Sequence, residues 1–135
     1  MSVEKIIIIL VIFSFFLTSI NVLGMQGDVL TREEAIEISK NSSLVQEGLA
    51  KAYYATIETH FYNSQRIEEL KEWHSNEIFK NVPKDAFWEE KVPEGHSVWE
   101  VIWYFKEGVG GYTVVVIVDA KVGVIITEAM GVKFL

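Results

Sequence analysis

The hydrophobic pattern divides the chain into an apolar leader, a helical part and a strand-forming part. Residues 6–20, IIIILVIFSFFLTSI, are an apolar run that only three hydroxyl side chains interrupt. In residues 32–52 the apolar positions recur with helical spacing. From residue 98 onward they come in short runs of β-branched and aromatic residues, which favour strands. Helices followed by a run of strands indicate an α+β domain.

Residues 1–24 have the composition of an export signal. Lys5 precedes the apolar core, and Val22 and Gly24 are small enough for the positions that signal peptidase reads before its cut. Cleavage after Gly24 leaves residues 25–135 as one domain. An uncleaved membrane anchor is the alternative, because an apolar stretch of about 18 residues is the lower limit for crossing a bilayer. In both cases we expect the domain to be secreted or extracytoplasmic.

Two helices are predicted at the start of the domain. Thr31 and Glu34 have the spacing of a capping box, which predicts a helix over about 32–40. The segment Ser43-Leu44-Val45-Gln46 predicts the cap of a second helix, which Gly48 weakens.

Residues 53–92 predict a strand, a helix and a short edge strand. The stretch 53–62, YYATIETHFY, favours a strand, with a helix over 53–57 as the alternative. A helix follows from Asn63 or Ser64 and stops at Pro83. Its apolar stripe is Ile67, Leu70, His74 and Ile78. Residues 87–92 predict the short edge strand.

The C-terminal part predicts a β meander. Strands are expected over 98–106, 111–118 and 124–129, and short turns between them imply antiparallel pairing. We therefore expect a two-layer α+β domain, with the N-terminal helices on one face of a four- to five-stranded antiparallel sheet.

The second turn of the meander contains two residues with a structural role. Asp119 leaves a strand and can accept hydrogen bonds from the N–H groups that follow it. Gly123 is placed where such a turn needs a positive φ. Calcium binding is the less favoured interpretation, because calcium takes six or more oxygens and this turn has one acid.

The strand faces give the clearest indication of a binding surface. In 98–106 one face consists of Trp99, Val101, Trp103 and Phe105, which we expect to point at the helices. The opposite face is also largely apolar, although antiparallel sheets with a wet face usually alternate apolar with polar. An inserted segment, a second copy or a target protein must then cover it. The candidate partner-binding residues are Val98, Ile102, Tyr104, Val115 and Ile117.

Composition and charge exclude several functions. The net charge is −7 and the pI about 4.9, so nucleic acid is not an expected partner. The chain has no cysteine, which excludes disulfides and thiol chemistry. No nucleophile motif is present, and no cofactor is expected. The histidines His60, His74 and His96 lack metal-ligand spacing, so no metal is expected. The alternative is a zinc site completed by Glu58 or Glu77.

Three stretches resemble the PepSY domain family. They are Leu30–Ile38 (LTREEAIEI), Trp99-Glu100-Val101, and Tyr112–Ile125, which contains VDAKVG. Val122 replaces a threonine of the family pattern, and the connection from Lys40 to Trp99 is long, as an inserted strand and helix would make it. The resemblance implies an exported module that regulates by binding protein, with protease inhibition as the usual role and no catalytic residues.

The sequence thus predicts an exported, non-enzymatic module that binds a protein and inhibits or chaperones a secreted hydrolase. The alternative is a structural envelope protein that associates with itself as a homodimer or larger assembly. An enzyme or metal-binding protein is the third interpretation. Contact with a membrane is expected only through residues 1–24, if these are retained.

Overall fold

The computed structural model describes residues 29–131, which form helices and one sheet. The predicted export segment and its cleavage site lie outside the described residues. The elements, in chain order, are α2 (Arg32–Ser39), α3 (Ser43–Lys51), β1 (Tyr54–Tyr62), α4 (Ser64–His74), three short 3-10 turns η1 (Glu77–Phe79), η2 (Lys84–Ala86) and η3 (Trp88–Lys91), then β2 (Val98–Glu107), β3 (Gly110–Asp119) and β4 (Ile125–Met130).

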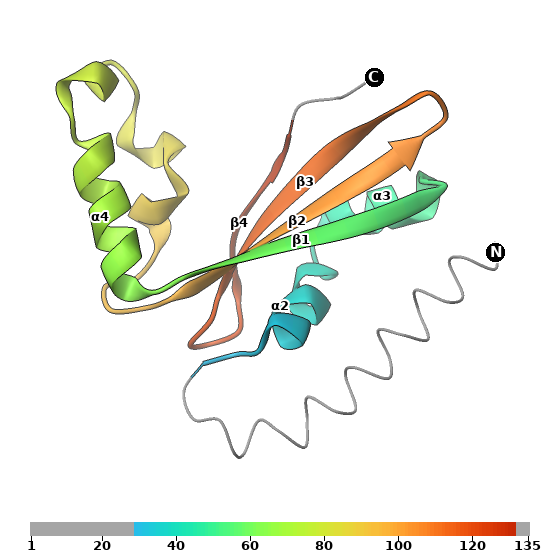
Figure 1. Cartoon of the computed structure of the whole chain (residues 1–135), viewed down its shortest axis with the longest axis horizontal. Coiled ribbons are helices and arrows are strands. Elements are labelled where there is room, and N and C mark those ends of the chain that lie inside the picture. The colour runs from blue at the N-terminus through green and yellow to red at the C-terminus, as the bar shows by residue number, and fades with distance from the viewer. Residues whose placement is uncertain (1–28, 132–135) are drawn as a thin grey trace.

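The sheet has four antiparallel strands in the order β1-β2-β3-β4. A two-residue turn with Gly108 at φ 54° joins β2 to β3, and residues 63–97 connect β1 to β2. Figure 1 shows α2 and α3 on one side of the sheet and α4 on the other. The α+β prediction, with helices before a meander, is confirmed. None of the helices within 29–131 is long and apolar enough to span a membrane.

The main core lies between α2, α3 and what we call the first face of the sheet. On β2 this face consists of Trp99, Val101, Trp103 and Phe105. The predicted capping box begins α2, since Thr31 Oγ1 accepts the N–H of Glu34 and the Glu34 carboxylate accepts the N–H of Thr31. Val101, Trp103 and Phe105 are fully buried and Trp99 is partly buried, so one strand gives these helices a broad apolar surface to cover.

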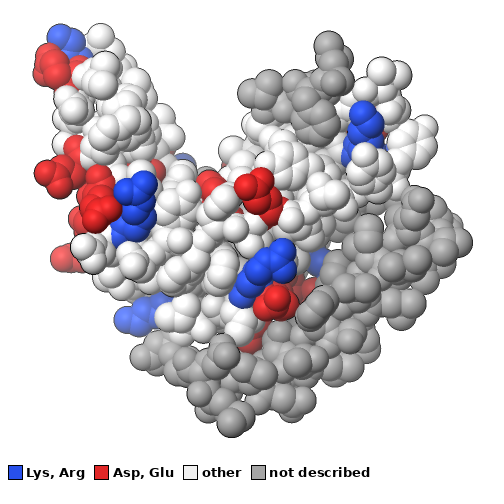
Figure 2. All heavy atoms as spheres, in the orientation of Figure 1, with Lys and Arg blue, Asp and Glu red and all other residues white. Residues whose placement is uncertain are grey.

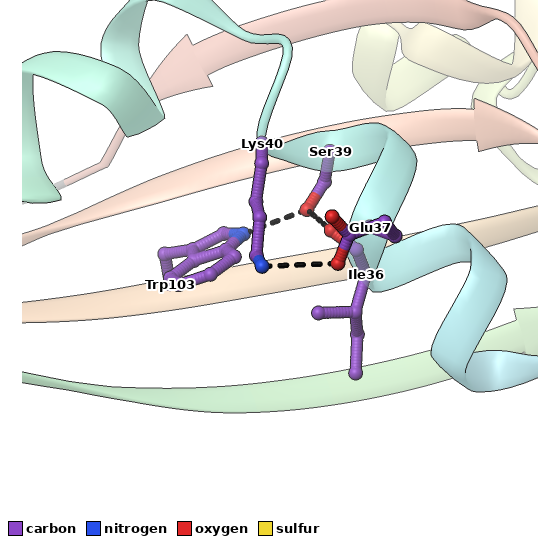
Figure 3. Close-up of polar contacts among 5 residues, drawn as sticks. All are labelled: Ile36, Glu37, Ser39, Lys40 and Trp103. Carbon is purple, nitrogen blue, oxygen red and sulfur yellow. Dashed lines mark hydrogen bonds and ion pairs between the residues drawn. The ribbon is translucent and has the colours of Figure 1, made fainter. Parts of the chain in front are cut away.

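A buried hydrogen bond fixes α2 on the first face. The Trp103 indole N–H donates to Ser39 Oγ at 2.9 Å, and Ser39 Oγ donates to the carbonyl of Ile36 at 2.6 Å (Figure 3). Both side chains are fully buried, so the bond satisfies an indole that would otherwise lose its water. An ion pair between Lys40 and Glu37 closes the same end of the helix.

We call residues 63–97, which contain α4 and η1 to η3, the arm. It rises from the end of β1 (Figure 1), and Ile67 and Val92 at its base pack against the opposite, second face of the sheet. Ile67 of α4 and Val92 are buried there with Val98 and Ile117 of the sheet. This small second core attaches the arm to the domain.

The arm differs from the sequence prediction in two places. The helix α4 ends at His74 rather than at Pro83, because Asn76 caps a separate 3-10 turn through a bond to the N–H of Glu77. Ile78, expected in the apolar stripe, is 75% exposed. Residues 87–92 contain the 3-10 turn η3 and form no edge strand, since both sheet edges are made by β1 and β4.

Candidate functional site

The strand register determines which side chains share the second face. Glu100, Ile102 and Tyr104 of β2 lie opposite Ile117, Val115 and Thr113 of β3. On the other side of β2 the same three residues lie opposite His60, Glu58 and Thr56 of β1. The five candidate partner-binding residues are therefore on one face, together with polar residues of β1.

The arm covers one half of this face. Val98 and Ile117 are 0% and 1% exposed and pack with Ile67 and Val92. Trp88 adds an edge-to-face ring contact to Tyr62, with centroids 5.2 Å apart. Val98 and Ile117 are thus part of the protein's own core. The inserted segment, one of the three alternatives, covers them, so they are not open to a partner as the candidate list expected. The apolar pattern left the alternatives open because it does not say where the arm folds back.

We call the other part the open half of the second face, and its residues are Glu58, His60, Glu100, Ile102, Tyr104 and Val115. Ile102, Tyr104 and Val115 keep part of their surface exposed. Figure 2 shows a notch between the arm and the rest of the domain, with acidic side chains near its base. The open half therefore combines apolar surface with carboxylates in a concave setting.

A hydrogen-bonded group crosses from β1 to β2 in the open half. The Tyr104 hydroxyl donates to Glu58 Oε2 at 2.7 Å, and His60 Nε2 lies 2.9 Å from Glu58 Oε1. The bond from Tyr104, followed by that from His60, lowers the pKa of Glu58. The same bond raises the pKa of Tyr104. Glu58 is thus held ionised at neutral pH.

Glu100 has a different environment. Burial raises the pKa of its carboxyl, and the nearby charge of Glu58 adds to this, while His60 and a hydrogen bond with Tyr62 oppose it. Lys106 is the one Lys or Arg that β2 contributes to this face. Its ammonium group donates to the carbonyl of Val109 in the hairpin between β2 and β3. The site therefore offers two carboxylates, and a basic group from a partner would meet favourable electrostatics.

The three histidines pair with three different carboxylates in separate parts of the fold. His60 contacts Glu58 on the sheet, His74 contacts Glu89 within the arm, and His96 contacts Asp119 at the second turn of the meander. Within residues 29–131, no three side chains of His, Asp or Glu are placed to share a metal ion. Glu77, the other alternative zinc ligand, pairs with Lys80.

The pair in the arm is almost completely enclosed. Glu89 is 1% exposed, and the ring of its partner His74 stacks on Phe87 with centroids 4.0 Å apart and planes at 12°. Phe79 meets the edge of the same imidazole. The sequence identified His74 as part of an apolar stripe, but no local pattern indicated that an acid fifteen residues later would meet it.

Asp119 organises the turn between β3 and β4. Its Oδ1 accepts the N–H groups of Lys121 at 2.8 Å and Val122 at 3.1 Å, and its Oδ2 lies 2.6 Å from His96 Nδ1. Gly123 has φ 73°, and its N–H donates to the Asp119 carbonyl. With all these bonds formed, the buried Asp119 has a structural explanation that needs no calcium.

The three segments that resemble the PepSY family meet at this turn. The N–H of Leu30 donates to the carbonyl of Ala120 at 2.8 Å, and the indole of Trp99 donates to the carbonyl of Leu30 at 2.9 Å. The start of α2, the first meander strand and the Asp119 turn are thus in direct contact. Comparisons of the chain with family models, with curated proteins and with solved structures find no match.

Proposed function

We propose that the protein is an exported, non-enzymatic module that binds another protein through the open half of its second face. The observation that carries this proposal is the uncovered part of a sheet face whose other half the arm already covers. Ile102 and Val115 supply apolar area, and Glu58 and Glu100 supply charge beside it. Protein interfaces combine an apolar centre with a polar rim in this way.

The arm adds a second exposed apolar element to this surface. Its side chains Trp73, Ile78 and Val82 all retain large exposed fractions. Exposed aromatic and aliphatic side chains mark a contact surface where they lie together in one patch. A secreted hydrolase, such as a protease, is the specific target that we propose.

The PepSY resemblance supports the same proposal. Its three segments are far apart in the sequence, yet Leu30, Trp99 and Ala120 are joined by hydrogen bonds. A motif whose separate parts form one structural unit is better support than three isolated matches. We infer a PepSY-like module in which the arm is the added element.

Substitution of Ile102 tests the binding surface. Wild-type protein is expected to retain a hydrolase from the organism's secreted fraction and to lower its activity, and Ile102→Lys is expected to lose both effects. Val109→Lys is the matched control, because Val109 is 90% exposed at the hairpin between β2 and β3. Circular dichroism should show both variants folded, whereas Trp103→Lys should unfold through an unpaired charge in the core.

Two results would contradict the proposal. Equal retention by wild-type protein and Ile102→Lys would move the binding surface elsewhere. A wild-type protein that affects no secreted hydrolase would remove the proposed target class. Export is tested separately by mass spectrometry of the native protein, for which we expect a chain that begins at Met25.

A further inference from the structure

The two edges of the sheet differ in how they are protected. The edge strand β1 has nine residues without proline, glycine or lysine, and it pairs with β2 in unbroken register from Tyr54 to Tyr62. The opposite edge strand β4 has six residues, and its pairing shifts between Ile117 and Val118. Short edges, bulges, prolines and lysines are among the devices that prevent edge pairing, and β1 has none of these four.

The register shows which backbone groups of β1 point outward. The N–H of Gly131 donates to Thr113, so the odd-numbered residues of β3 bond toward β4. Because bonding alternates along antiparallel strands, the even-numbered residues of β3 bond to the odd-numbered residues of β2. The even-numbered residues of β2 then bond to those of β1. The outward N–H and C=O groups belong to Ala55, Ile57, Thr59 and Phe61.

These outward groups have no backbone hydrogen bond to any other residue within 29–131. An unbroken edge with outward donors and acceptors is a template for another strand. We infer that it pairs with β1 of a second copy of this chain, antiparallel and with Thr59 opposite the partner's Thr59. The hydrogen bonds of this interface are made by the backbone of the sheet edge, so the pairing does not depend on the proposed function.

The side chains of β1 are self-complementary in this register. On the second face, Glu58 comes opposite the partner's His60, and His60 comes opposite the partner's Glu58. On the first face, Ile57 comes opposite the partner's Phe61, which is 44% exposed in one copy. Opposite-charge and aromatic–aliphatic cross-strand pairs both stabilise antiparallel strands.

Centring the pair on Ile57 instead removes this complementarity. Glu58 would then lie opposite a threonine, and His60 opposite a tyrosine. Both registers use the outward backbone groups, and the charges favour the Thr59-centred one. It joins two four-stranded sheets into one continuous sheet, with the open halves of the two second faces side by side.

Single cysteines test this register directly, because the chain has no cysteine of its own. In the Thr59-centred dimer the two residues 59 have Cα atoms about 5.5 Å apart, within the range that a disulfide bridges. Thr59→Cys, in the naturally processed protein and under mild oxidation, should give a cross-linked dimer on a non-reducing gel. Ile57→Cys is the matched control, since its two copies would be about 13 Å apart.

A proline tests the hydrogen bonds themselves. Thr59→Pro removes an outward N–H and leaves the ladder between β1 and β2 intact, so the fold should persist and the dimer should be lost. Thr59→Val keeps the N–H and should remain dimeric. Light scattering over a wide concentration range measures both, and circular dichroism checks the fold.

The inference would be overturned by a wild-type protein that stays monomeric at every concentration. It would also be overturned by cross-linking of Ile57→Cys that equals that of Thr59→Cys, because the register would then be different. A dimer that survives a folded Thr59→Pro variant would place the interface elsewhere.

Discussion

Single residues in this protein stabilise more than one part of the fold, and Asp119 in the turn after β3 is an example. Asp119 accepts two backbone N–H groups with one oxygen and meets His96 with the other, while Gly123 closes the same turn. A buried carboxylate is tolerated here because every described partner donates to it or can carry a positive charge. The turn also anchors the segment before α2 through the bond from Leu30 to Ala120.

Gly123→Ala should destabilise the domain by about 1 kcal/mol or more, because alanine is strained at positive φ. The added methyl itself would meet Ile38 and Leu30 at 3.4 and 3.5 Å, which is ordinary contact. The cost is therefore conformational, and urea unfolding should report it. Gly95→Ala is a useful comparison, because Gly95 also has a positive φ but open space around its Cβ position. A Gly123→Ala variant as stable as wild type would contradict the assignment.

The contribution of Glu100 to the free energy of unfolding should fall as pH rises through the acidic range. Burial raises the pKa of this carboxyl in the folded state above its unfolded value of 4.5. The folded protein thus holds the proton more tightly, so the stabilisation is complete below the unfolded pKa and lost as pH rises through the folded pKa. Glu100→Gln should melt higher than wild type at neutral pH, and the two should converge at low pH. A Gln variant that melts lower at neutral pH would show that the ionised form is favoured.

At the scale of elements, the packing of α3 on the sheet explains why this helix contains Gly48, a residue with low helix propensity. Gly48 lowers the intrinsic stability of α3, yet it is buried where the helix crosses the ring of Phe105. A Cβ at this position would lie 2.5 Å from the ring. The close approach of helix and strand therefore requires the glycine, and a better helix former would push them apart.

Gly48→Ala should destabilise the protein by about 1–3 kcal/mol through overpacking, despite its gain in helix propensity. Phe105→Leu removes the ring and should itself be destabilising. The double variant should lose less stability than the sum of the two single variants, because the shared clash is gone. Additive losses in chemical denaturation would show that Gly48 and Phe105 do not interact.

At the scale of the whole molecule, the protein consists of a helix-and-sheet body and an arm held by few contacts. The body has a continuous core on the first face, whereas the arm depends on a small cluster around Ile67 and on the enclosed pair His74–Glu89. Segments with few buried apolar contacts unfold locally at lower free energy than the core. The arm is therefore the part of the molecule whose position a partner can change at low cost.

His74→Ala should loosen the arm without unfolding the sheet. The substitution leaves the Glu89 carboxylate buried without its partner, which is strongly unfavourable. Amide hydrogen exchange should show lost protection in α4 and η3 and unchanged protection in β2 and β3. His60→Ala is the control, since its pair with Glu58 is exposed. Loss of protection throughout the chain would mean that arm and sheet unfold as one unit.

Outside residues 75–97, the sequence by itself determined the order of the helices and strands and the face of β2 that meets the helices. Local rules suffice there: a capping box begins α2, and alternation on β2 gathers Trp99, Val101, Trp103 and Phe105 on one side. The turn at Asp119 and Gly123 was likewise predictable, because Asx and glycine turn chemistry depends on neighbouring residues.

Only the tertiary structure decided which half of the second face is covered and how the histidines are paired. Val98 and Ile117 are as apolar as Ile102, yet they are buried in the cluster that Ile67 and Val92 of the arm form with the sheet, whereas Ile102 keeps part of its surface exposed. The contacts of His74 with Glu89 and of His96 with Asp119 join residues 15 and 23 positions apart. Such contacts follow from the packing of whole elements, which no local periodicity encodes.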